Sequence, residues 1–221
     1  MIRLNKGKPA ELYTPTNSSD KLGFIQSLKR LLRLSFKSYS NCKVSEDKWN
    51  KQYKSGHWDY LADIKELSHN SIIAGYAHRF SSNGNILDIG CGNGVLQQTL
   101  DKYGYNHYTG IDISSEAISI AQSFANKQTE FICSSASDFK SDKRYNVIIF
   151  NECLYYLEKP IETINMLKNY LEPDGKIIIS MFGDDEPVVN CWKLVDELNS
   201  EVDSVMVTHK SGTYWIIKVL S

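Results

Sequence analysis

The sequence lacks several features that would place it in other classes of protein. No apolar run approaches the ~18 residues that a membrane-spanning helix needs. The first residues, MIRLNKGKPAELY, contain no apolar stretch of the kind found in secretory signals. The five cysteines are an odd number and include no CxxC pair, and the five histidines show no metal-ligand spacing. These absences predict a cytoplasmic protein with free thiols and no metal site.

Neither sign of charge predominates over the whole chain, which has 25 Lys+Arg, 26 Asp+Glu and a formal net charge of −1. The balance hides an asymmetry, because residues 1–56 hold 12 basic and 4 acidic side chains whereas the remainder holds 13 and 22. A solvated basic cover on an acidic domain is the interpretation that we favour. Contact with a membrane surface or with nucleic acid is the alternative.

The composition that is present is ordinary for a globular protein. Hydrophobic residues make up 42% and charged residues 23% of the 221 residues. This excludes a collagenous, fully disordered or multi-span membrane chain. The length allows one domain, or one domain with a small appendage.

The N-terminal part predicts a leader followed by an amphipathic helix. Residues 1–20 are polar and proline-containing, and apolar residues then recur at helical spacing over residues 21–39. We expect residues 1–44 to form this basic leader and helix. Its apolar face can pack on the domain, as we favour, or make a peripheral membrane contact through residues 21–39.

The rest of the chain alternates strands and helices, which predicts βαβ units and a mainly parallel sheet. We expect an α/β fold with a seven-stranded sheet, helices on both faces, an N-terminal helical extension and a C-terminal antiparallel hairpin. The predicted turn at residues 173–175 precedes the fifth strand. The expected strands are 86–89, 108–113, 130–133, 145–150, 176–181, 202–208 and 214–220. The expected helices are 45–53, 59–80 in two pieces, 95–103, 116–125, 161–171 and 188–198.

The most informative segment is ILDIGCGNG at residues 86–94. A buried strand runs into three alternate glycines and then a helix, whose N-terminus offers free N–H groups to an anion. Asp112 closes the next strand, where a carboxylate can accept both hydroxyls of a ribose. Together these features predict a ligand that contains adenosine.

The loop differs from the dinucleotide fingerprint GxGxxG, because Val95 stands where the third glycine of that fingerprint would fall. Asp88, two residues before the first glycine, would repel a pyrophosphate. It would suit a ligand with an ammonium group and a sulfonium, and S-adenosylmethionine has both.

Residues 86–94 resemble the first motif of class I S-adenosylmethionine-dependent methyltransferases with a Rossmann-like fold. TGIDIS around Asp112 and NYLEPDGKIIIS at residues 169–180 resemble two further segments of the family. The resemblance covers about residues 45–221 and implies a methyltransferase domain with a helical lid over residues 45–80. It is specific for cofactor and fold, and poor for the substrate.

The resemblance also implies which residues hold S-adenosylmethionine. Ser135 departs from the family, which often has an aspartate there, so Ser135, Ser137 or the backbone alone can hold the adenine amine. An aromatic face attracts cationic charge, which would suit Tyr53 and Trp58 above the sulfonium; the alternative is an ordinary packed helix. The predicted cofactor-binding residues are Asp88, Gly90, Cys91, Gly92, Asp112, Ile113, Ser135, Ala136, Ser137, Asn151, Tyr53 and Trp58.

The methyl acceptor is expected beyond the fourth strand, where ligands bind in open α/β sheets. Glu152 is the best-placed carboxylate for taking a proton, with Tyr156 and His57 as further catalytic candidates. Each has an ordinary alternative: a helix cap or ion pair for Glu152, core packing for Tyr156 and a solvated loop for His57.

The predicted function is transfer of a methyl group to an oxygen or nitrogen of a small molecule, such as a sugar, a lipid-linked intermediate or a secondary metabolite. We expect a monomer or homodimer that binds no nucleic acid. The alternatives are an RNA or protein methyltransferase and a non-catalytic S-adenosylmethionine-binding scaffold. A nicotinamide oxidoreductase is the fallback.

Overall fold

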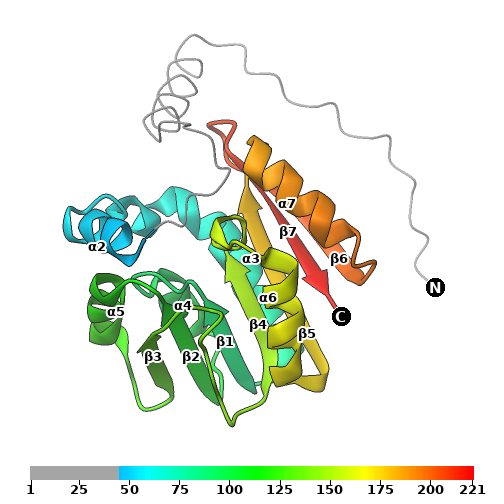
Figure 1. The fold of residues 1–221 in the computed structure, drawn as a ribbon, viewed down its shortest axis with the longest axis horizontal. Coiled ribbons are helices and arrows are strands. Elements are labelled where there is room, and N and C mark those ends of the chain that lie inside the picture. Colours follow the sequence, from blue (N-terminus) through cyan, green and yellow to red (C-terminus); the bar gives the residue numbers. More distant parts are fainter. Residues whose placement is uncertain (1–44) are drawn as a thin grey trace.

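The computed structural model describes residues 45–221 (Figure 1). The predicted leader and helix within residues 1–44 lie outside the described residues. Within residues 45–221, no helix is both long enough and apolar enough to cross a bilayer.

A single seven-stranded sheet forms the centre of the fold, in the order β3-β2-β1-β4-β5-β7-β6 (Figure 1). The five strands β1 to β5 pair in parallel, whereas β7 runs antiparallel to both β5 and β6. This arrangement confirms the predicted mainly parallel sheet with a terminal antiparallel hairpin. The strands are β1 (Asn85–Ile89), β2 (His107–Asp112), β3 (Thr129–Cys133), β4 (Tyr145–Asn151), β5 (Leu171–Phe182), β6 (Glu201–Thr208) and β7 (Tyr214–Leu220).

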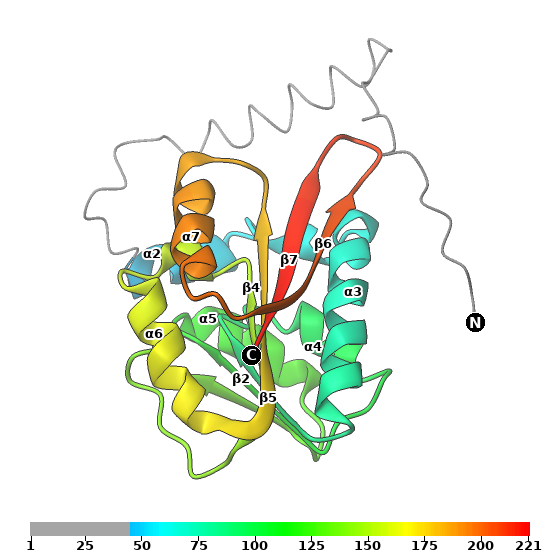
Figure 2. The same cartoon turned by 90° about the vertical axis from the view of Figure 1, so that its right-hand side faces the viewer.

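Helices cover both faces of the sheet, and each face has its own apolar core (Figure 2). On one face lie α3 (Ile64–Ser81), α4 (Val95–Leu100) and α5 (Ser115–Ala121); on the other lie α6 (Pro160–Leu167) and α7 (Glu186–Asp196). The central strands are apolar on both sides because parallel sheets are buried between two helical layers. Short 3₁₀ turns complete the fold: η1 (Asp59–Ala62), η2 (Gln122–Phe124), η3 (Leu154–Tyr156) and η4 (Lys168–Tyr170).

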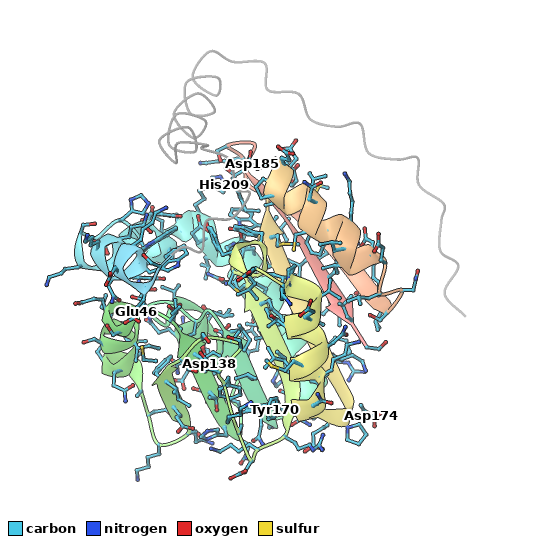
Figure 3. All side chains as sticks on the ribbon, in the orientation of Figure 1. Glu46, Asp138, Tyr170, Asp174, Asp185 and His209 are labelled. Atoms are coloured by element: carbon cyan, nitrogen blue, oxygen red, sulfur yellow. The ribbon has the colours of Figure 1, made fainter. Side chains whose placement is uncertain are left out.

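Helix α2 (Glu46–Lys54) stands apart from these two layers, above the carboxyl ends of β1, β2 and β3 (Figure 1). Figure 3 shows Glu46, on its first turn, close to α5, whereas Tyr170 and Asp174 lie at the opposite edge of the sheet. The edge beneath α2 is where an open α/β sheet binds its ligand.

The segment before the fifth strand differs from the prediction. Helix α6 ends at Leu167 and η4 follows it, whereas we expected a helix to residue 171. Strand β5 begins at Leu171, and the predicted turn at residues 173–175 lies inside it. The pairing shifts from Tyr145↔Leu171 to Val147↔Lys176, so the turn residues form an irregularity in the ladder. Pro173, which cannot donate a ladder hydrogen bond, is one of the residues left out of the pairing.

Candidate active site

The glycine loop follows β1 and turns back through left-handed backbone. Gly90, Gly92 and Gly94 have φ of 69°, 54° and 83°, a region that favours glycine. A Cβ on Gly90 would lie 2.6 Å from Cys153 Cβ, and one on Gly92 would lie 2.7 Å from the hydroxyl of Tyr53. The loop therefore requires glycine for both its conformation and its close neighbours, leaving its backbone accessible to a ligand at close range.

Asp112 joins the glycine loop to the start of α5. Its Oδ2 accepts a hydrogen bond from Gly92 N at 3.0 Å, and its Oδ1 accepts one from Ser114 N at 2.8 Å. Burial raises the pKa of the carboxyl, and these backbone donors oppose the rise. Since a carboxylate oxygen can accept more than one hydrogen bond, Asp112 is held in place while keeping lone pairs for the two hydroxyls of a ribose.

Asp88 lies beneath the loop, and its side chain is almost fully buried. Its Oδ2 accepts a hydrogen bond from the Tyr108 hydroxyl at 2.6 Å, whereas its buried Oδ1 has no partner among the described residues. Burial raises the pKa of Asp88 to about 7. An acidic oxygen without a donor fits the positively charged methionine end of S-adenosylmethionine, so the residues present suit that cofactor.

The predicted adenine contacts lie after β2 and β3. Ile113 is 37% exposed although it is apolar, so an apolar side chain next to Asp112 is accessible to a ligand. The Ser135 hydroxyl donates to Asp138 Oδ2 at 2.6 Å and lies 2.9 Å from the hydroxyl of Ser137. Ser135 and Ser137 are thus tied into the loop with Asp138, and Ala136 lies between them. This leaves the role of the three residues in adenine binding a prediction.

Cys91 contributes to the loop through packing. Its backbone N–H donates to Ile111 O at 2.9 Å, which ties the loop to β2. The side chain is buried, and burial raises the pKa of the thiol well above its ordinary value. A neutral buried thiol is a small packing group, not a nucleophile. All four cysteines of the described part of the chain are free.

Aromatic side chains from α2, the loop after it and η3 form a cluster, here called the roof, that meets the glycine loop through Tyr53. Trp58 contacts the rings of Trp49, Tyr53 and Tyr60 at centroid distances of 5.5, 6.2 and 5.9 Å. Trp49 in turn meets Tyr156 edge-on at 5.1 Å. The predicted residues Tyr53, Trp58 and Tyr156 are therefore brought together, from α2, the loop after it and η3. Such a roof excludes water and presents ring faces that attract a cation.

Glu152 follows β4 in an uncommon left-handed conformation, with φ of 57°. Its Oε1 accepts from Ser180 Oγ at 3.1 Å, and its Oε2 accepts from Phe182 N at 3.0 Å and from the Tyr155 hydroxyl at 3.3 Å. Burial raises the pKa of Glu152 to about 8, and these donors oppose the rise. The carboxyl is anchored to β5, and its pKa lies near neutrality, where a group can both take up and release a proton.

His57 and Asn151 have different surroundings from Glu152. His57 is exposed, and its ring contact within residues 45–221 is with Trp58, at 4.9 Å. Asn151 Nδ2 donates to Asn70 Oδ1 at 3.1 Å, so its amide faces α3, and its buried Oδ1 has no partner in the described chain. The structure does not join His57 to Glu152 by any hydrogen bond or ring contact in this part of the chain.

Sequence reasoning missed two groups of polar residues at this edge. On α3, Glu66, His69 and Asn70 are buried, and the His69 ring stacks on Trp215 at 4.5 Å. Burial lowers the pKa of His69 to about 3, so the ring is neutral. The second is a single residue, Asn50 of α2, whose contacts are described below. Polar residues at helical positions that should be apolar were the one available signal for the α3 group.

A family model described as a methyltransferase domain matches residues 59–206, which include the glycine loop, Asp112 and Glu152. The chain belongs to this family of methyltransferases. The predictions of a class I S-adenosylmethionine-dependent methyltransferase fold and family are confirmed, and with them S-adenosylmethionine as the cofactor of that family.

Among curated proteins, the chain is 28% identical over 130 residues to malonyl-[acyl-carrier protein] O-methyltransferase of Bacillus cereus, covering 57% of this chain and 48% of that protein. It is 32% identical over 142 residues to ubiquinone biosynthesis O-methyltransferase of Rickettsia akari, covering 62% and 56%. The chain thus spans about half the length of the curated relatives it matches.

Solved structures show the same fold. The plantazolicin methyltransferase BpumL in complex with SAH aligns with a TM-score of 0.57 at 19% identity, covering 91% of this chain and 98% of that one. The N-methyltransferase NodS from Bradyrhizobium japonicum aligns with a TM-score of 0.58 at 20% identity, covering 72% and 98%.

Proposed function

We propose that the protein transfers the methyl group of S-adenosylmethionine to a hydroxyl oxygen of a small molecule. The observation that carries the proposal is the position of the Asp112 carboxylate. Gly92 N and Ser114 N hold it beside a glycine loop that has no room for side chains. The two curated relatives named above support oxygen as the acceptor atom, since both are named O-methyltransferases, whereas the solved structure of NodS is that of an N-methyltransferase. Transfer to nitrogen remains the other form of the same proposal.

In this proposal the cofactor supplies an electrophilic methyl group, and the chain binds, orients and shields it. Asp112 holds the ribose, and the buried carboxyl of Asp88 favours the ammonium group electrostatically, without contacting it. The rings of Tyr53 and Trp58 exclude water above the sulfonium, where a desolvated and aligned methyl group reacts faster. Tyr156 extends this roof toward the acceptor.

Glu152 is the proposed proton acceptor. It follows β4, on the side of the sheet edge where the acceptor is expected, and its carboxyl is anchored by Ser180 and Phe182 N. The carboxylate form of Glu152, a fraction that grows as the pH rises toward the pKa of about 8, would take the proton that the hydroxyl loses as its oxygen receives the methyl group, leaving Glu152 as the neutral acid. His57 is a weaker proposal, because its exposed ring has a single described contact, with Trp58.

Methyl transfer into fractionated cell extract tests the function. With S-adenosylmethionine tritiated in the methyl group, we expect label in the small-molecule fraction. Label in the protein or RNA fraction instead would favour the corresponding alternative.

A substitution tests the role of Glu152. Glu152→Gln should slow turnover at least about tenfold, while the affinity for S-adenosylhomocysteine changes little. The matched control is Glu197→Gln, at an exposed position on the surface. Unchanged turnover in Glu152→Gln would give Glu152 a structural role.

A further inference from the structure

Asn50 joins helix α2 to the segment that follows β2 by side-chain hydrogen bonds. Its Oδ1 accepts hydrogen bonds from Ser114 Oγ at 2.7 Å and from Glu116 N at 3.3 Å. The partners are 64 and 66 residues away in the chain, so the contact belongs to the tertiary fold. Because Asn50 accepts from the first turn of α5, α2 is fixed on the segment that follows β2.

Ser114 carries this contact to the ribose-binding carboxylate. Its side chain is fully buried, and its oxygen accepts from Ala117 N at 3.1 Å while its proton goes to Asn50. The backbone N–H of the same residue donates to Asp112 Oδ1. Every polar group of Ser114 that faces the site is therefore engaged, and a displacement of Asn50 is passed to Asp112 through one residue.

The same helix reaches the glycine loop one turn later. Residues three apart share a helix face, which places Tyr53 beside Asn50 on the side of α2 that meets the site. Tyr53 is buried, and its hydroxyl lies 2.7 Å from the place where a Cβ on Gly92 would stand. Gly92 N donates to the other oxygen of Asp112. Helix α2 therefore approaches both oxygens of Asp112 indirectly, with Asn50 acting through Ser114 and Tyr53 through Gly92.

We propose that Asn50 is a positioning residue of the cofactor site, which acts through Ser114 on Asp112 and keeps Tyr53 over the glycine loop. The inference rests on the proposed function. Its consequence is cooperativity: the cofactor is bound more tightly when α2 is docked, and α2 is docked more firmly when the cofactor is bound. A residue that only capped α5 would contribute to stability without this coupling.

Two measurements on the full chain test the coupling, with S-adenosylhomocysteine as the probe. Calorimetry gives its affinity, and hydrogen exchange of residues 46–54 gives the docking of α2 with and without the probe. The variants are Asn50→Ala, Asn50→Asp and Lys51→Ala. Asn50→Asp keeps an acceptor at the same place, and Lys51→Ala changes an exposed neighbour on the same helix.

We expect Asn50→Ala to bind the probe about three- to tenfold more weakly, as the loss of one or two hydrogen bonds implies. The probe should slow exchange of residues 46–54 in the unchanged protein and in Lys51→Ala, and should no longer do so in Asn50→Ala. Asn50→Asp should recover most of both effects.

Unchanged affinity in a folded Asn50→Ala protein would overturn the inference, even if its melting temperature fell, because that is the result for a cap alone. Equal weakening by Asn50→Asp would overturn it too. Failure of the unchanged protein to bind the probe would instead overturn the proposed function on which the inference rests.

Discussion

Gly92 shows how a single residue sets the geometry of the glycine loop. An alanine there would need left-handed backbone, which costs roughly 1–2 kcal/mol, and its Cβ would meet the Tyr53 hydroxyl at 2.7 Å. We expect Gly92→Ala to weaken binding of S-adenosylhomocysteine at least about tenfold, measured by calorimetry. The matched control is Gly212→Ala, where φ is 84° and no atom lies within 4 Å of the Cβ.

Both alanine variants should lose thermal stability to backbone strain, and Gly92→Ala should lose more, because its Cβ also meets the Tyr53 hydroxyl. Only Gly92→Ala should lose affinity, since only that Cβ enters the site. Equal affinity in the two variants would show that the close approach of Tyr53 to the loop has no role in binding.

Asp88 makes stability depend on pH. Its pKa is raised to about 7 by burial, so the folded state holds a proton that the unfolded state releases near pH 4. The stabilisation is complete below the unfolded pKa and is lost as the pH rises through about 7. Glu152, with a pKa of about 8, acts in the same direction.

We therefore expect the unliganded protein to be less stable at pH 8 than at pH 5, by roughly 2 kcal/mol or more from Asp88. Urea unfolding at the two pH values measures this. Asp88→Asn should reduce the difference, because an amide does not titrate. A difference of the same size in Asp88→Asn would show that Asp88 is charged in the folded protein at both pH values.

At the scale of elements, α3 packs on the sheet and also contacts the turn η1. Ile73 is fully buried against the sheet, whereas its neighbour Ile72 is 38% exposed. The same change at the two positions separates packing from helix propensity. Ile73→Ala should lower the free energy of unfolding by about 2–5 kcal/mol, and Ile72→Ala by less than about 1 kcal/mol.

Chemical denaturation of the two variants checks this expectation. Comparable losses for Ile72→Ala and Ile73→Ala would contradict the packing of α3 on the sheet. A small loss in both would show that the face of the sheet beneath α3 collapses around the missing atoms.

The sequence was sufficient for elements and motifs whose signals are local. The glycines and Asp112 stand at strand ends, and the alternation of strands and helices predicts the order of the elements along the chain. The segment at Pro173 was assigned wrongly, because its irregular pairing depends on the register of β4, a separate strand. The docking of Asn50 on Ser114 was not predicted, since a contact across 64 residues leaves no local pattern.

Glu152 was predicted from the sequence only in part. Its place after β4 follows from the chain, but its pKa and its bonds to Ser180 and Phe182 depend on the pairing of β4 with β5. The sequence therefore identified the residue and left open whether it was exposed or anchored. The same holds for Trp58, whose contacts with Trp49 and Tyr53 depend on how α2 packs.

At the scale of the whole molecule, the proposed cofactor site lies where separate parts of the chain meet. The glycine loop and the ends of β2 and β4 contribute its floor, and α2 contributes its roof (Figure 1). All of these parts lie within residues 45–221. The charge asymmetry of the sequence places most of the acidic excess in this part, which suits a cofactor with a positively charged methionine end.

Calorimetric titration of the full chain with S-adenosylhomocysteine tests the central claim, that the glycine loop and Asp112 form the cofactor site. The comparison is between the unchanged protein, Asp112→Ala and Asp174→Ala, an exposed acidic residue at the opposite edge of the sheet (Figure 3). We expect binding by the unchanged protein and Asp174→Ala, and an affinity roughly ten- to a hundredfold lower for folded Asp112→Ala. Equal affinity for all three, or no binding by the unchanged protein, would contradict the account.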